Sequence, residues 1–168
     1  MRLKNAGIAA AFCGVLAAGG LAVERQDPVF QVHPIGTVAR EGGKTYLVIH
    51  EKYAKGLTGL EGFSHVQVLY WFDRNDNPQK RGILEVHPRG NAQNPLTGVF
   101  ACRSPVRPNL IGLSTCKILG VEKNRVQVAE IDAFDNTPLV DLKPFIPPDA
   151  PTQDVRVPAW AGKPEGDK

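Results

Sequence analysis

The sequence is poor in aromatic residues and in cysteine, and neither sign of charge dominates it. Aromatic side chains make up 7% of the 168 residues, and three residues are cysteines. The 20 lysines and arginines nearly balance the 17 acidic residues, for a formal net charge of +3. This balance does not indicate a nucleic-acid-binding protein, because such proteins usually have an excess of clustered basic residues. Hydrophobic residues at 42% and charged residues at 22% exclude a disordered chain.

Common catalytic and metal-binding motifs are absent as well. The sequence holds no glycine-rich dinucleotide loop, phosphate-binding loop, zinc-protease helix or serine-hydrolase elbow. The stretch from Asp73 begins like a calcium loop, but Pro78 stands where that loop requires glycine. The four histidines are scattered and show no zinc spacing with the cysteines. We therefore expect no metal site, and we assign no catalytic residue.

The first 22 residues have the pattern of a secretory signal peptide. Arg2 and Lys4 precede a stretch from Ala6 to Ala22 that carries no charge and ends in small residues. Cleavage before Val23 predicts an exported protein, periplasmic or secreted, with no stable membrane span in the mature chain. The alternatives are an uncleaved N-terminal anchor, or a cytoplasmic protein in which this stretch is an ordinary buried helix.

Two cysteines, Cys102 and Cys116, remain after such a cleavage. An even number of cysteines in an oxidising compartment permits one disulfide. We favour the simpler interpretation that both are small buried residues in separate strands.

Short β-like runs separated by turn residues fill the rest of the chain. The sequence contains 17 glycines and 14 prolines, which leave little room for long helices. Tight turns are expected at 41–44 and 122–124, a loop at 73–82, and a short helix within 51–60. The strand-like runs are 32–40, 45–50, 63–72, 83–87, 98–102, 111–121, 125–131 and 140–146.

This succession of strands predicts a mainly all-β fold, a small antiparallel β-barrel with short helical turns. We place the barrel domain at residues 33–147, after a lead-in at 23–32 and before a proline-rich tail at 148–168. The run 63–72 is long and apolar, so we expect it to be buried on both faces near its end.

Residues 98–114 hold two arginines on a stiff loop. Pro105 and Pro108 restrict the backbone around Arg103 and Arg107. Two guanidinium groups with pre-set donor geometry suit a carboxylate or a phosphate. The arginines suit carbonyls and carboxylates of the domain itself equally well. The residues alone leave both interpretations open.

Four blocks of the sequence, in this order, resemble the TrmO family, which is also called TsaA-like or YaeB-like. Members of that family are S-adenosylmethionine-dependent methyltransferases built on a small β-barrel. Their characterised reaction is the N6-methylation of threonylcarbamoyladenosine at position 37 of certain tRNAs. The blocks are Pro34–Val38, Gly59–His65 with the apolar strand that follows, Gly98–Ser114, and Asp132–Pro144.

The resemblance implies a cofactor site for S-adenosyl-L-methionine. Arg103 is suited to hold the cofactor's carboxylate, and Asp132 or Asp135 its ribose hydroxyls or amino group. Arg107 and Asn109 are assigned to the substrate. The residues assigned to the cofactor are Phe72, Asp73, Arg103, Leu113, Ile131, Asp132, Ala133, Phe134 and Asp135.

The sequence also departs from the family pattern. Residues 40–44 form a five-residue turn where family members carry a longer segment that contributes to the cofactor site. Asp73 stands where a histidine is usual. For Asp141 and Lys143, we favour an ion pair over a catalytic role.

Two functions remain open on this basis. The first is a TrmO-type methyltransferase that modifies tRNA, if the protein is cytoplasmic, or an unidentified acceptor. The second is an exported, non-enzymatic barrel that binds another small anionic ligand. The resemblance also implies a homodimer, because family barrels form dimers that share sites.

Overall fold

The computed structural model describes residues 28–148 and 155–161, and the chain divides into two units. In the first unit, residues 1–31, the described residues 28–31 are exposed and lack regular secondary structure. The predicted signal peptide at 1–22 lies outside the described residues and stays a prediction. Within the described ranges, no helix is long and apolar enough to cross a membrane.

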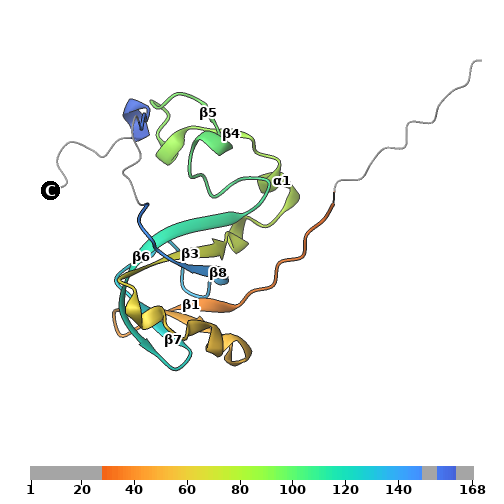
Figure 1. Ribbon diagram of the computed structural model, residues 1–168. Coiled ribbons are helices and arrows are strands. Elements are labelled where there is room, and N and C mark those ends of the chain that lie inside the picture. Colours follow the sequence, from red (N-terminus) through yellow and green to blue (C-terminus); the bar gives the residue numbers. More distant parts are fainter. Residues whose placement is uncertain (1–27, 149–154, 162–168) are drawn as a thin grey trace, which may run out of the picture. The chain divides into compact units, whose positions relative to one another are not determined.

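Six strands of the second unit form a closed antiparallel β-barrel, which confirms the predicted fold (Figure 1). Their order around the barrel is β1-β2-β7-β6-β3-β8, and every neighbouring pair is antiparallel. The barrel closes where Gly36 pairs with Leu139 and Thr37 with Pro138. The strands are β1 (Gly36–Glu41), β2 (Lys44–Ile49), β3 (His65–Trp71), β6 (Ile111–Glu122), β7 (Arg125–Val128) and β8 (Pro138–Pro144).

The remaining elements are short and lie between the barrel strands or follow them. Strands β4 and β5 pair with each other in a separate two-stranded sheet. These elements are η1 (Glu51–Leu57), η2 (Leu60–Gly62), η3 (Asp73–Asn75), α1 (Pro78–Arg81), β4 (Glu85–Val86), η4 (Pro88–Gly90), β5 (Thr97–Gly98), η5 (Val99–Ala101) and η6 (Ala159–Ala161).

Two strand-like runs of the sequence do not become barrel strands. The run 83–87 contributes only the two residues of β4, outside the barrel. The run 98–102 leaves β5 at Gly98 and continues as η5. The prolines that follow this run have no backbone N–H to donate to a sheet ladder, so the chain crosses the barrel end as a loop instead.

The predicted loop 73–82 contains the helical turn α1. Asn77 caps this turn, because its side-chain oxygen accepts a hydrogen bond of 2.9 Å from the backbone N–H of Lys80. Pro78 follows in the first turn, where its missing N–H costs no hydrogen bond. The Asn77-Pro78 pair therefore marks the start of a helical turn, which the loop-like composition of 73–82 did not indicate.

Alternate residues of the strands form the core of the barrel. Val38, Leu47, Val66 and Val68 are fully buried, and each contributes about 1.5–3 kcal/mol by leaving water. The residues between the buried positions of β3 stay half-buried along its whole length. The expectation that the end of this strand is buried on both faces was therefore wrong, because the described residues cover the outer face of the barrel only in part.

Glycine is required at two places near the start of the barrel. Gly42 and Gly43 have φ values of 56° and 76°, as a two-residue hairpin turn between β1 and β2 demands. At Gly36, a Cβ atom would lie 2.1 Å from the carbonyl oxygen of Val48. A side chain there would push β1 and β2 apart at the seam where the barrel closes.

Cys102 and Cys116 are both free, so the disulfide that the cysteine count permits is not formed. Cys116 is 2% exposed, and Cys102 is half-buried. Burial, with a smaller contribution from the Glu130 carboxylate, raises the pKa of the Cys116 thiol to about 11. The Cys116 thiol therefore stays neutral and shielded near pH 8.

We predict that Cys116 of the folded protein resists alkylation at pH 8. The thiolate is the reactive form, and both burial and the raised pKa keep its population low. Peptide mass spectrometry after iodoacetamide treatment should show Cys102 modified well before Cys116, and both modified after unfolding in guanidinium. Equal rates for the two cysteines in the folded protein would contradict the burial described here.

Candidate functional site

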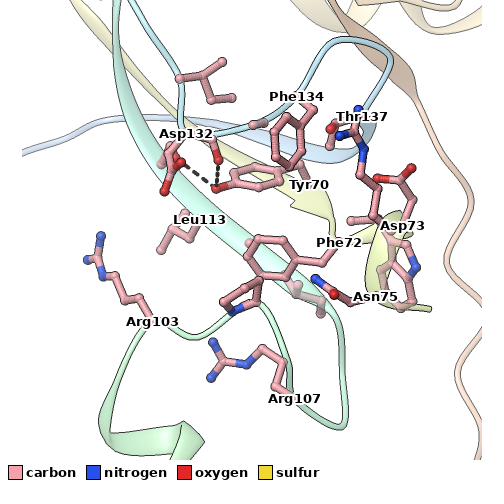
Figure 2. Close-up of a pocket in the computed structure, with 18 of the residues that line it drawn as sticks. Tyr70, Phe72, Asp73, Asn75, Arg103, Arg107, Leu113, Asp132, Phe134 and Thr137 are labelled. Carbon is pink, nitrogen blue, oxygen red and sulfur yellow. Dashed lines mark hydrogen bonds between the residues drawn. The ribbon is translucent and has the colours of Figure 1, made fainter. Parts of the chain in front are cut away.

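A cavity of about 940 Å3 opens at one end of the barrel (Figure 2). The end of β3 and the start of β6 meet there, since Trp71 pairs with Ile111. The loop before β8 forms another wall, and the proline-restricted loop at 103–107 forms a third. Figure 2 shows Tyr70, Phe72 and Leu113 between these walls.

The structure brings together the residues that the resemblance assigned to the cofactor. All nine of them line this cavity, and so does Arg107. Ile131 is 6% exposed and belongs mainly to the hydrophobic core. Asn109, which was assigned to the substrate, is not among the lining residues; its carbonyl oxygen accepts the backbone N–H of Ile111 instead.

The two arginines of the loop differ in what they contact. The Arg107 guanidinium donates a hydrogen bond of 3.2 Å to the carbonyl oxygen of Val99, so it helps to fix its own loop. Arg103 is exposed and makes no hydrogen bond or ion pair within the described residues. The sequence left open whether the two arginines bind a ligand or groups of the domain itself. In the structure, Arg107 binds a carbonyl of the domain, whereas Arg103 is available to a ligand.

Arg40, near the end of β1, holds the loop at 131–135 in place from the neighbouring strand. One guanidinium nitrogen donates to the carbonyl oxygens of Ile131, at 3.1 Å, and Ala133, at 2.8 Å. The other lies 3.4 Å from the Thr45 hydroxyl. The backbone N–H of Arg40 donates to the Asp135 carboxylate at 2.8 Å. Three of these bonds fix the loop to Arg40, and the bond to Thr45 joins the Arg40 guanidinium to β2.

Tyr70 holds the same loop from the inside of the barrel. Its hydroxyl donates to the carbonyl oxygen of Asp132 at 2.6 Å and lies 3.3 Å from the Ser114 hydroxyl (Figure 2). Burial of the ring raises the pKa of Tyr70, which keeps the hydroxyl protonated as a donor. The ring packs on Gly112, where a Cβ would lie 2.4 Å from the Tyr70 Cε2 atom.

The carboxylates of the cavity also differ in whether they are hydrogen-bonded within the chain. Asp135 accepts the Arg40 backbone N–H on one oxygen and the Asn136 side-chain amide on the other, at 3.0 Å. Asp135 therefore shapes the turn before β8 and is a poor ligand for ribose hydroxyls. The Asp132 and Asp73 carboxylates make no hydrogen bond or ion pair with any described residue, so both can accept from a ligand.

Aromatic rings give the cavity flat apolar surfaces. Phe72 meets Tyr70 edge-to-face, with ring centroids 5.4 Å apart. Phe134 is 60% exposed, and the guanidinium carbon of Arg74 lies 3.8 Å from the centre of its ring. A planar ligand group can lie against such rings with the same geometry.

A cluster of Trp71, Asp76 and Arg81 contacts the loop that carries Arg103 and Arg107. The two oxygens of Asp76 accept from the Trp71 indole N–H and from the Arg81 Nε, both at 2.9 Å. Arg81 also donates to the carbonyl oxygen of Pro108 at 2.8 Å. The Arg81 guanidinium, followed by the Trp71 indole, lowers the pKa of the Asp76 carboxyl. The cluster thus ties η3 and α1 to the loop that carries Arg103.

The family model of the tRNA-methyltransferase O N-terminal domain matches residues 30–149. The chain belongs to this family.

The chain is similar in sequence to other proteins over much of the barrel domain. A probable S-adenosyl-L-methionine-binding protein of Methanocaldococcus jannaschii is 45% identical over 117 residues, 70% of this chain and 93% of the relative. A tRNA (adenine(37)-N6)-methyltransferase of Mus musculus is 43% identical over 90 residues, which are 54% of this chain and 20% of the mouse protein.

A solved structure shows the same fold. The crystal structure of TrmO from Pseudomonas aeruginosa superposes with a TM-score of 0.59 at 27% identity, and the match covers 77% of this chain. The matched part spans 62% of that TrmO chain. The match therefore spans less than two thirds of that TrmO chain.

Sequence reasoning missed Arg40, Tyr70 and Ser114 in this TrmO-type site. Arg40 was counted only as the last residue of a strand-like run and the first of a turn, and Tyr70 only as an apolar strand position. Their partners are backbone carbonyls about 60 to 90 residues away in the chain, which no local pattern reveals. The ion pair favoured for Asp141 and Lys143 is confirmed, with 3.0 Å between the Asp141 Oδ2 and the Lys143 Nζ.

We predict that Arg40→Ala loosens the loop at 131–135 while the barrel stays folded. The change removes the guanidinium donors of two carbonyls, for a loss of roughly 1–2 kcal/mol of stability in a partly exposed setting. Hydrogen exchange followed by mass spectrometry should show faster exchange in residues 131–137. Arg125→Ala, which removes the exposed Glu41–Arg125 ion pair, is the matched control. Unchanged exchange in the loop of the Arg40 variant would contradict its proposed role.

The Asp76 cluster predicts a dependence of stability on acidic pH. A carboxyl whose pKa is lowered by folding adds stability above its unfolded pKa of about 3.9, and loses that stability as pH falls through the folded pKa. The pair is exposed, so the contribution is small, roughly 0.5 kcal/mol. Urea unfolding should show a difference between wild type and Asp76→Asn at pH 7 that shrinks below about pH 4. A difference that grows toward low pH would reject this assignment.

Proposed function

We propose that the chain binds S-adenosylmethionine in the barrel-end cavity and uses it as a methyl donor, as an enzyme of the TrmO type. The observation that carries this proposal is the pairing of an unpartnered guanidinium, Arg103, with an unpartnered carboxylate, Asp132, on different walls of one cavity (Figure 2). A ligand with a carboxylate and a cationic amine needs both groups.

The residues present fit this cofactor in size and in chemistry. A volume of about 940 Å3 lies within the range of cavities that hold small molecules. Arg103 is suited to the methionine carboxylate, and Asp132 or Asp73 to the amine or the ribose hydroxyls. The exposed ring of Phe134 is suited to the adenine. Relatives that share the barrel are named as S-adenosyl-L-methionine-binding proteins.

Bound in this cavity, the cofactor supplies a methyl group on a positively charged sulfur. The chain's own contribution is to orient it and to shield it from water. Leu113 and Phe72 give an apolar lining beside the polar anchors. The Tyr70 hydroxyl, kept protonated, holds the Asp132 backbone so that the carboxylate stands at a fixed place.

The acceptor we propose is an adenine of tRNA. The mouse and rat relatives are named tRNA (adenine(37)-N6)-methyltransferases, and they match this chain over 90 residues each. Because the matched part is 20% of those proteins, the acceptor requires a test of its own.

A binding protein for another small anion is the second candidate function. It is favoured by Arg103, which makes no hydrogen bond or ion pair in the described part of the chain. It is also favoured by the tight hairpin between β1 and β2, since Arg40 is the one residue of 40–44 that lines the cavity. This function is consistent with export of the protein, which the pattern of residues 1–22 predicts. Export and a homodimer are proposals that rest on the sequence and the resemblance, and cell fractionation and light scattering test them.

We predict that S-adenosylmethionine binds the chain and that Arg103→Ala weakens this binding about tenfold. A hydrogen bond to a charged group contributes about 1.5–3 kcal/mol, and tenfold corresponds to 1.4 kcal/mol. Titration calorimetry measures both affinities, with Arg125→Ala as the matched control on the barrel surface.

The two candidate functions give different results in the same experiment. Binding of the cofactor by wild type, together with transfer of a labelled methyl group to unmodified tRNA, supports the enzyme. Absence of cofactor binding, with retention of a small carboxylate or phosphate that Arg103→Ala abolishes, rejects the enzyme and supports the anion-binding protein.

A further inference from the structure

The wall of the cavity at η3 carries an arginine, Arg74, whose guanidinium lies on the ring of Phe134. The guanidinium carbon is 3.8 Å from the ring centre, well within the range of a cation–π contact. Both residues line the cavity, but Arg74 comes from η3 and Phe134 from the loop before β8. The family resemblance assigned Phe134 to the cofactor and gave Arg74 no role. The contact joins two walls of the cavity through their side chains.

The backbone on both sides of Phe134 is fixed, but these bonds do not fix its ring. Arg40 donates to the carbonyl oxygen of Ala133 at 2.8 Å, and the backbone N–H of Thr137 donates to that of Phe134 at 3.3 Å. The Phe134 side chain is 60% exposed and lies outside the hydrophobic core. An exposed side chain samples several rotamers unless a neighbour restricts it. Arg74 is such a neighbour.

Arg74 starts from a rigid part of the chain. The backbone N–H of Asn75 donates to the carbonyl oxygen of Phe72 at 2.9 Å, which closes the turn around Arg74. Asp76, which follows this turn, accepts from the Trp71 indole N–H, also at 2.9 Å. Because η3 is held at both ends, the Arg74 guanidinium can restrict the ring instead of following its motion.

The contact leaves part of the Phe134 ring open to a ligand (Figure 2). A guanidinium at 3.8 Å covers one face of the ring, yet the residue is still 60% exposed, so the opposite face is open. A planar base can stack on that face. A ring that already has one orientation loses less side-chain entropy when the base binds, and the affinity is higher for that reason.

We propose that Arg74 is a positioning residue, which holds the Phe134 ring as a preformed surface for the adenine of the ligand. This inference rests on the proposed function, in which the cavity binds S-adenosylmethionine. Arg74 acts on the ligand through the ring and not by a contact of its own. The affinity for an adenine-bearing ligand therefore depends on Arg74 only while residue 134 is aromatic.

Titration calorimetry with S-adenosylmethionine tests this coupling. Arg74→Ala should weaken binding about two- to fivefold, the size of an exposed cation–π contact. Arg74→Lys keeps a cation for the ring and should recover part of the loss. Phe134→Leu keeps an apolar side chain but removes the ring, so Arg74→Ala added to it should cause no further loss. Arg125→Ala removes a guanidinium 4.3 Å from the Tyr46 ring, outside the cavity lining, and is the matched control.

Nuclear magnetic resonance of the ligand-free protein reports the contact itself. Protons above the face of an aromatic ring resonate upfield, so the Arg74 Nε–H signal of wild type should lie upfield of its position in Phe134→Leu. The upfield shift should persist when S-adenosylmethionine is added, because the base takes the opposite face of the ring.

Four results would overturn the proposal. They are an affinity unchanged by Arg74→Ala, tighter binding by that variant, an equal loss with and without the Phe134 ring, and loss of the upfield shift when the ligand binds. Circular dichroism of each variant shows whether the barrel is folded. Absence of S-adenosylmethionine binding by wild type rejects the proposed function and this inference with it, whereas binding that does not depend on Arg74 rejects this inference alone.

Discussion

The closure of the barrel between β1 and β8 is the constraint on which the candidate site depends. The ladder there is two residue pairs long, from Gly36 and Thr37 to the start of β8. Two further backbone hydrogen bonds, of 2.9 and 2.8 Å, continue the contact from Val38 to Thr137 and Asn136. Arg40 follows at the end of the same strand and binds the loop that leads into β8. The same strand, β1, therefore closes the barrel and positions one wall of the cavity.

The polar groups around the cavity divide between the fold and a ligand. Arg40, Asp135 and Arg107 are bonded to the chain itself, and these bonds set the shape of the walls. Arg103 and Asp132 are exposed, so water satisfies them until a ligand replaces it. Among the described residues, no buried side-chain nitrogen or oxygen lacks a hydrogen-bond partner. The site is thus formed without placing an unsatisfied polar group in the core.

The sequence predicted those parts of the fold that short-range patterns encode. The hairpin around Gly42 and Gly43, the hairpin at 122–124 and the alternation along β3 all follow from turn chemistry and a period of two. The runs 83–87 and 98–102 were misjudged as strands because a five-residue run can form a ladder or a turn, and only tertiary context decides. The convergence of the cofactor residues came from the resemblance and not from spacing.

What the sequence could not reveal is how each polar residue is used. Arg103 and Arg107 lie four residues apart on the same loop, and local chemistry treats them alike. The difference arises because Arg107 reaches the Val99 carbonyl, whereas Arg103 is exposed and bonds to no described residue. Likewise, Asp132 and Asp135 are equivalent in composition, but Asp135 is engaged by Arg40 from a distant strand. Such assignments depend on contacts formed only after the chain has closed.

Charge then decides which ligand suits the cavity at Arg103. The guanidinium shares this cavity with the unpartnered carboxylates of Asp73 and Asp132, so a ligand that carries both signs of charge loses least when it leaves water. A guanidinium has five N–H donors, and within the described residues Arg103 uses none of them in a hydrogen bond. A ligand carboxylate can therefore take two of these donors side by side, while an amine on the same ligand reaches a carboxylate on another wall.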